Sequence, residues 1–234
     1  MKKKKAFTLA EVLITLTIIG VIVAITIPNL MQSWRKHERI TQIKEAYSII
    51  QNATRMAVAE HGNPDGWDFN GYLNYAQKYF VPYIKIQKVC GSGTAKSDFK
   101  ESGCFKKSGR SEDNGTWSTL AGRDYEMSGY GAYSYYTMIF QNGMHLGIWA
   151  PVKNNQGAQR NIIFLVDVDG KQGPTTLGKD IFIFRYNLDT GKFMTGGDSG
   201  DYSDCTLTGA GTACAYWIER NHWEFPDDYP VKKF

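Results

Sequence analysis

Three aspartates are the side chains of this sequence best suited to binding a metal ion. Asp167 and Asp169 flank a valine, and Asp180 follows a short distance further along the chain. Carboxylate oxygens are the hard ligands that Ca²⁺ prefers, so one interpretation is a calcium site built from these three residues. The spacing does not fit an EF-hand loop, because Gly178 occupies the twelfth position, where that loop has a glutamate. The favoured interpretation is therefore that Asp169-Gly170 forms a turn, that Asp180 is a surface charge, and that no cofactor is required.

The four cysteines can form disulfides or bind a metal. They allow three pairings into two disulfides, and an oxidising compartment would favour disulfides over free thiols. We expect the two local pairs, Cys90–Cys104 and Cys205–Cys214, because each would close a glycine-rich loop. A zinc site is the alternative, but none of the four has the C-x-x-C spacing typical of zinc ligands.

Two short segments look like parts of enzymes but lack the residues that their chemistry needs. The stretch 197–200 reads Gly-Asp-Ser-Gly, as in the serine loop of trypsin-like proteases, but Asp201 follows it and no histidine lies in an Ala-His-Cys context. The stretch 91–97 evokes a phosphate-binding loop, but Ala95 replaces the glycine of the G-K-[ST] motif. The sequence therefore predicts no catalytic residue and no enzymatic activity.

The positive charge of the chain is concentrated at its N-terminus. The 234 residues carry a formal net charge of +4, which equals the four lysines at positions 2–5. A nucleic-acid-binding protein usually carries its basic residues as a patch on the folded domain. Because the remaining charges balance, nothing in the composition indicates nucleic-acid binding.

A long apolar stretch follows these lysines. The residues from Val12 to Trp34 include no charged side chain, and about 20 such residues are enough to cross a bilayer as a helix. The lysines before it fit the cytoplasmic flank of a membrane span. A conventional secretory signal is the alternative, but its apolar core is shorter and ends at a small-x-small cleavage site, which is missing here. Glu11 is unusual, because a carboxylate at the edge of a membrane helix needs a partner or a role unless it simply reaches the headgroups.

The elements that position these residues can be predicted from periodicity. Apolar side chains recur at helical spacing beyond the apolar stretch, at Ile40, Ile43, Tyr47, Ile50 and Ala57, so we expect one helix over about residues 8–60. Pro28 should bend it, and Gly62 should end it. A short helix is expected at about 71–80. Strands are expected over 133–140, 145–149, 162–167 and 180–187, with a possible fifth over 215–219, and Asn142-Gly143 should form a hairpin turn.

The N-terminal sequence resembles the class III signal of type IV pilins and type II secretion pseudopilins. The matching residues are the basic leader, the small residue Ala6, and Phe7, Thr8, Leu9 and Glu11, with Pro28 inside the apolar helix. The resemblance implies cleavage by a prepilin peptidase between Ala6 and Phe7, and N-methylation of Phe7. Ala6 stands where the family usually has glycine, so we expect slower processing.

Cleavage would also give Glu11 a partner. The new ammonium group at Phe7 could pair with Glu11 of a neighbouring subunit, and setting register is the best-attested use of a buried ion pair. We therefore expect Leu9, Glu11 and Pro28 to serve assembly. Segments around 167–182 and 205–221 resemble the loop-strand motif and the tail of bacterial prepilin-type proteins.

Together these features predict an α+β protein in which a long N-terminal helix packs on an antiparallel sheet. The expected parts are a leader (1–6), a transmembrane and polymerisation helix (7–34), its amphipathic continuation (35–61) and an extracytoplasmic head (62–234). The favoured function is that of a structural subunit of a type IV pilus or a type II secretion pseudopilus, held in the bacterial inner membrane. An adhesive or ligand-binding minor subunit using Trp117, Tyr130 and Trp149 is the alternative, and a membrane-tethered enzyme is the least supported.

Overall fold

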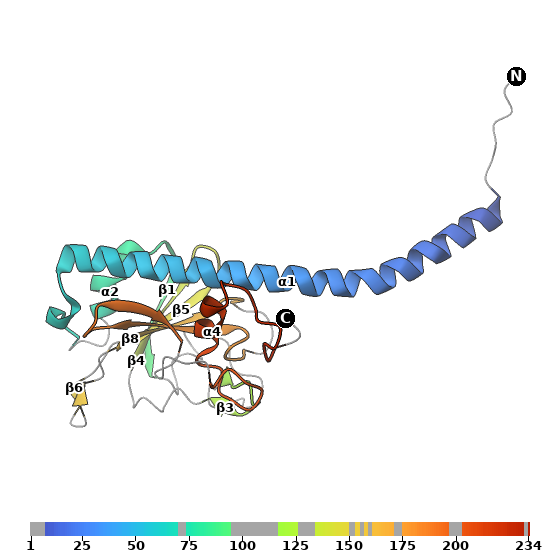
Figure 1. Cartoon of the computed structure of the whole chain (residues 1–234). Coiled ribbons are helices and arrows are strands. Elements are labelled where there is room, and N and C mark those ends of the chain that lie inside the picture. The colour runs from blue at the N-terminus through green and yellow to red at the C-terminus, as the bar shows by residue number, and fades with distance from the viewer. Residues whose placement is uncertain are drawn as a thin grey trace, which may run out of the picture.

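The architecture is that of a long helix lying along one face of a sheet (Figure 1). It comes from a computed structural model, which describes residues 8–69, 74–94, 117–125, 134–149, 153–154, 157–158, 161–170, 175–196, 203–231 and 234. This arrangement confirms the predicted α+β class.

Helix α1 (Leu9–His61) begins and ends close to the predicted positions. Its first turn is closed by a capping box, and at its end the amide of Gly62, with φ of 76°, donates to the carbonyl of Val58 at 2.9 Å. Pro28 lies inside the helix, whose N-terminal half curves away from the head (Figure 1). A proline ring removes one backbone hydrogen bond, which accounts for a bend without a break.

The second half of α1 packs on the sheet through the predicted apolar stripe. Ile43, Ile50 and Ala57 are fully buried, and Ile40 and Tyr47 pack against the core. Two further alanines, Ala46 and Ala53, are also buried, so the contact face is wider than the stripe predicted from large side chains.

The main sheet has six strands in the order β1-β4-β5-β8-β9-β10, and every pairing is antiparallel. The strands are β1 (Ile86–Thr94), β4 (Ser134–Phe140), β5 (His145–Trp149), β8 (Asn161–Asp167), β9 (Ile181–Asn187) and β10 (Lys192–Thr195). Two small ribbons pair β2 (Trp117–Ser118) with β3 (Asp124–Tyr125) and β6 (Lys153–Asn154) with β7 (Gly157–Ala158). The short helices are η1 (Pro64–Gly66), α2 (Asn74–Tyr79), η2 (Val81–Tyr83) and α4 (Cys214–Arg220).

The predicted Asn142-Gly143 hairpin joins β4 to β5. Gly143 has a φ of 87°, and the Phe140 amide donates to the Met144 carbonyl at 2.9 Å. The strand period of two then places Leu146 and Ile148 of β5 beside Val166 and Phe164 of β8 in the core under α1. This turn, the end of β8 and the start of β9 lie together at the same end of their strands, close to Gln42 of α1.

The structure corrects one element prediction and adds two strands to the main sheet. The segment 215–219 is part of helix α4 and not a fifth strand. Its start is stabilised by Asp204, whose carboxylate accepts the amides of Thr212 at 2.9 Å and Ala213 at 2.8 Å. Strands β1 and β10, which the sequence did not predict, occupy the two edges of the sheet.

Candidate functional site

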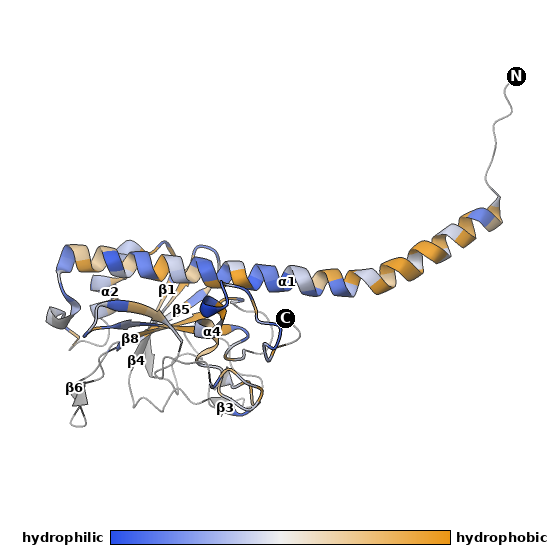
Figure 2. Ribbon diagram, in the orientation of Figure 1, coloured by the Kyte–Doolittle hydropathy of each residue, from blue (hydrophilic) through white to orange (hydrophobic). Residues whose placement is uncertain are grey.

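The first half of α1 is an apolar surface that the rest of the chain leaves uncovered (Figure 2). Leu9 is 79% exposed and Leu30 is 71% exposed, and large apolar side chains stay exposed all along this stretch, through to Trp34. Helix α1 is long and apolar enough to cross a membrane. Because burying each large apolar side chain is worth about 1.5–3 kcal/mol, this surface needs lipid or another protein to cover it.

Three threonines on this surface form hydrogen bonds within the helix itself. The hydroxyls of Thr15 and Thr17 donate to the carbonyls of Val12 and Leu13 at 2.9 and 2.8 Å, and the hydroxyl of Thr26 donates to Ile22 at 2.9 Å. A hydroxyl that bonds back to its own helix carries no unsatisfied group into an apolar environment. These three hydroxyls are therefore compatible with a lipid or a dry helix bundle.

Glu11 closes the N-terminus of α1. Its carboxylate accepts the backbone amide and the hydroxyl of Thr8, both at 2.8 Å, and the Glu11 amide donates to the Thr8 hydroxyl at 3.3 Å. This reciprocal capping box gives Glu11 a local structural role that the sequence analysis did not anticipate. Ala6 and Phe7 lie outside the described residues, so cleavage, N-methylation and the pairing of Phe7 with Glu11 stay predictions.

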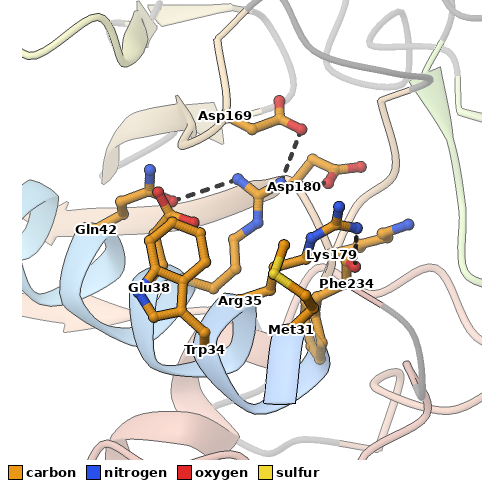
Figure 3. Close-up of a pocket in the computed structure, with 10 residues that line it drawn as sticks. Met31, Trp34, Arg35, Glu38, Gln42, Asp169, Lys179, Asp180 and Phe234 are labelled. Atoms are coloured by element: carbon orange, nitrogen blue, oxygen red, sulfur yellow. Dashed lines mark hydrogen bonds and ion pairs between the residues drawn. The ribbon is translucent and has the colours of Figure 1, made fainter. Parts of the chain in front are cut away.

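An arginine of α1 joins two of the three aspartates that were considered as calcium ligands (Figure 3). The guanidinium of Arg39 lies 2.9 Å from the carboxylate of Asp169 and 3.4 Å from that of Asp180. Asp180 also accepts the Thr176 amide at 3.0 Å. Its side chain is only 2% exposed, so the prediction that Asp180 is a surface charge is wrong. The turn at Gly170 is confirmed by a φ of 62°.

The carboxylates in this cluster outnumber its cation. Asp167 is fully buried, and neither of its oxygens has a hydrogen-bond partner in the described part of the chain. Burial raises the pKa of Asp167 well above its ordinary value, and the neighbouring Asp169 and Asp180 act in the same direction. Burial, with the charge of Asp169, raises the pKa of Asp180 to about 7, although Arg39 opposes this. The cluster is therefore a place where the fold favours a bound proton.

These contacts bear on the calcium prediction. Among the described residues, no group of three histidines, cysteines or acidic residues has the geometry to hold a metal ion. Arg39 supplies the positive charge at Asp169 and Asp180. The arginine was missed because its partners are 130 and 141 residues away in the sequence.

The C-terminal part of the chain is tied back by a disulfide and by aromatic packing. Cys205 and Cys214 form a disulfide, as predicted. Cys90 is also disulfide-bonded, but Cys104 lies outside the described residues, so that pairing stays a prediction. Beyond α4, the rings of Phe225 and Phe234 pack with centroids 4.4 Å apart, and the Phe234 carbonyl accepts from Arg35 of α1 at 2.9 Å.

The aromatic residues considered for adhesion receive no support as a contact surface. Trp149 is 1% exposed and lies within the head. Tyr130 and the side chain of Trp117 lie outside the described residues. The serine-loop segment 197–200 lies outside them as well.

Comparisons with known proteins match two parts of the chain. The prokaryotic N-terminal methylation motif matches residues 1–27, which contain the leader, Phe7 and Glu11. A family of unknown function, DUF6613, matches residues 29–233. No curated protein and no solved structure matches the chain.

Proposed function

Because the chain belongs to the DUF6613 family and is type IV pilin-like by its N-terminal methylation motif and long apolar helix, we propose that it is a structural subunit of a type IV pilus or a type II secretion pseudopilus. A prepilin peptidase removes residues 1–6, and Phe7 is methylated. The subunit then polymerises through α1, with copies of itself or with other pilins or pseudopilins. Its role is mechanical and needs no cofactor.

The uncovered apolar half of α1 carries this proposal. The same helix packs against the sheet from Ile43 onward, so the head is fixed to the second half of α1 while the first half is an exposed apolar helix (Figures 1 and 2). Before assembly the inner membrane covers this exposed half. In the fibre the exposed halves of neighbouring subunits pack against one another, which replaces lipid contacts by protein contacts.

The N-terminal charge and the disulfide support the proposed orientation of the chain across the inner membrane. The four lysines at positions 2–5 favour a cytoplasmic N-terminus. The head then lies on the other side of the inner membrane, where the compartment is oxidising, and the Cys205–Cys214 disulfide fits that location. In this arrangement residues 7–34 form the membrane and polymerisation segment, and residues 62–234 form the head.

Mass spectrometry of the mature N-terminus tests the proposal. The protein recovered from sheared filaments should begin with N-methyl-Phe7, and cells lacking the prepilin peptidase should accumulate the form that retains the leader. An intact Met1 on assembled protein would contradict both the processing step and assembly through the exposed end of α1.

Pilus and pseudopilus are separated by the phenotype of a deletion strain. Loss of surface filaments with normal export of secreted proteins would assign the chain to a pilus, and the reverse result would assign it to a pseudopilus. Binding of the purified protein to a glycan or to DNA would favour the adhesive minor subunit instead.

A further inference from the structure

A cavity lies between α1 and the C-terminal tail, at the level where the apolar half of the helix ends. It has a volume of about 450 Å³. Its helical wall is a single face of α1 that begins at Met31 and Trp34 and continues through Glu38 to Gln42, and its other wall includes Lys179 and Phe234 (Figure 3). Of these side chains, Phe234 belongs to the buried core under the helix, and the others lie outside that core.

The charged groups around this cavity differ in whether they already have a partner. Arg39 is paired with Asp169 and Asp180. Arg35 donates to the Phe234 carbonyl, but neither it nor Lys179 forms an ion pair with any described carboxylate. Glu38 is exposed and forms no ion pair within the described ranges. In Figure 3, Glu38 and Trp34 lie on one side of the cavity and Lys179 on the other. Among the described residues, the lining of the cavity therefore includes two cations without an ion pair, Arg35 of α1 and Lys179 of the head, and one carboxylate without an ion pair, Glu38. Asp169 and Asp180 also line it, and both are paired with Arg39.

The position of the cavity relative to a bilayer follows from the length of the apolar stretch. The uncharged residues from Val12 to Trp34 span roughly 34 Å as a helix, slightly more than the ~30 Å hydrocarbon core. Trp34 is 58% exposed and Met31 is 43% exposed. A tryptophan at this depth lies among the headgroups, where its ring is commonly found. The apolar side of the cavity thus lies at the acyl boundary and its charged side at the headgroup level.

We propose that this cavity binds the headgroup of one membrane phospholipid that carries a phosphate and a primary ammonium group, that is, a phosphoethanolamine headgroup. The phosphate lies between Arg35 and Lys179, because guanidinium and ammonium groups form strong charge-assisted hydrogen bonds to phosphate. The lipid ammonium donates to Glu38, and Met31 and Trp34 pack on the glycerol and the upper acyl chain. The inference rests on the proposed function only in that α1 must be inserted in a membrane.

The test is native mass spectrometry of the full-length chain released from nanodiscs. The discs contain equal amounts of phosphatidylethanolamine, phosphatidylglycerol and phosphatidylcholine with identical acyl chains. The wild-type chain should retain one phosphatidylethanolamine in preference to the other two. Phosphatidylcholine has no ammonium proton to donate to Glu38, and phosphatidylglycerol has no ammonium at all.

Two variants with matched controls assign the contacts. Lys179→Gln should reduce retention of phosphatidylethanolamine and phosphatidylglycerol roughly tenfold, as expected for loss of a hydrogen bond between charged groups. Glu38→Gln should remove the preference for phosphatidylethanolamine over phosphatidylcholine and leave phosphatidylglycerol unchanged. Lys192→Gln, at an exposed lysine of β10, and Glu45→Gln, at an exposed glutamate of α1, should match the wild type.

Equal retention of the three lipids by the wild-type chain would overturn the proposal. So would a Lys179→Gln variant that loses filament assembly while its lipid retention is unchanged, because the cavity would then be a contact between subunits. A chain that keeps Met1 in filaments or fails to enter nanodiscs would instead contradict the proposed function. The two inferences therefore fail in distinguishable ways.

Discussion

Replacing Asp180 by asparagine should stabilise the head at neutral pH, although it removes a buried ion pair. Asp180 contacts Arg39 at 3.4 Å, and loss of that contact alone would predict a less stable protein. Burial and the charge of Asp169 nevertheless raise the pKa of Asp180 from 3.8 to about 7, which means that the folded protein favours the neutral carboxyl over the carboxylate. Asparagine is a neutral side chain of the same shape, and its oxygen can still accept the Thr176 amide.

The magnitude follows from proton linkage. Between pH 4 and pH 7 the folded state binds more protons at Asp180 than the unfolded state, so the free energy of unfolding falls as the pH rises. At ~1.36 kcal/mol per pKa unit, a shift from 3.8 to about 7 lowers the wild-type stability by about 2–3 kcal/mol between pH 5 and pH 7.5. Asp167, whose pKa is also raised, acts in the same direction. Asparagine does not titrate, so the Asp180→Asn variant lacks the part of this pH-dependent fall in stability that comes from residue 180.

The assay is urea unfolding of the full-length chain in detergent micelles, followed by tryptophan fluorescence at pH 5 and pH 7.5. The difference in stability between variant and wild type should move in favour of the variant by about 2–3 kcal/mol from the lower to the higher pH. Asp228→Asn, at an exposed aspartate of the tail, serves as the matched control and should show no such change. A variant that is less stable than wild type by the same amount at both pH values would refute the reasoning, because the Arg39 ion pair would then dominate.

Three further predictions concern assembly, the disulfide and a strained turn. Glu11→Gln keeps an acceptor for Thr8 but removes the charge, so the variant should insert normally and accumulate as monomer, since an unpaired buried cation costs about 3–5 kcal/mol. Fractionation of membranes and sheared filaments measures this, and equal incorporation would show that Glu11 acts only as a capping residue. Replacing Cys205 and Cys214 by serine should cost about 2–3 kcal/mol in urea unfolding, because the disulfide closes a short loop; an unchanged midpoint would show that the Asp204 cap alone orders this loop. His222→Gly should raise the free energy of unfolding by about 0.5–1 kcal/mol, and with it the midpoint, because His222 has a φ of 57°, which glycine adopts without steric cost. A lower midpoint would show that contacts of the imidazole outweigh the backbone strain.

The elements that depend on local pattern could be predicted from the sequence. Helix α1 follows from an unbroken apolar stretch and a helical stripe that stops at Gly62, and the β4–β5 hairpin follows from Asn142-Gly143 between two strands of period two. The methylation motif could also be predicted, because its leader, Phe7 and Glu11 lie within a dozen residues of one another. Each of these features is defined by neighbours along the chain, so a single sequence contains the whole signal.

Helix α4 shows where local pattern was insufficient. Its aromatic and β-branched residues favour a strand, but its buried side chains, Cys214, Ala215 and Ile218, follow helical spacing. The amides of Thr212 and Ala213, just before the helix, donate to the carboxylate of Asp204, which lies ahead of the disulfide-closed loop. When the stabilising side chain comes from a residue far from the first turn, the sequence next to the helix start lacks the capping residue from which a helix is usually predicted.

The ionic contacts between helix α1 and the head, from Arg39 to Asp169 and Asp180, depend on the tertiary structure alone. The sequence offered Asp167, Asp169 and Asp180 as an acidic group, and their chemistry admitted either a metal site or exposed surface charges. Packing of α1 on the sheet brings Arg39 to Asp169 and Asp180, and it leaves Asp167 buried with no cation from the described residues at its oxygens. Ionic partners separated by more than a hundred residues leave no periodic trace in the sequence, because electrostatic energy depends on distance in space and on burial, which only the folded chain defines.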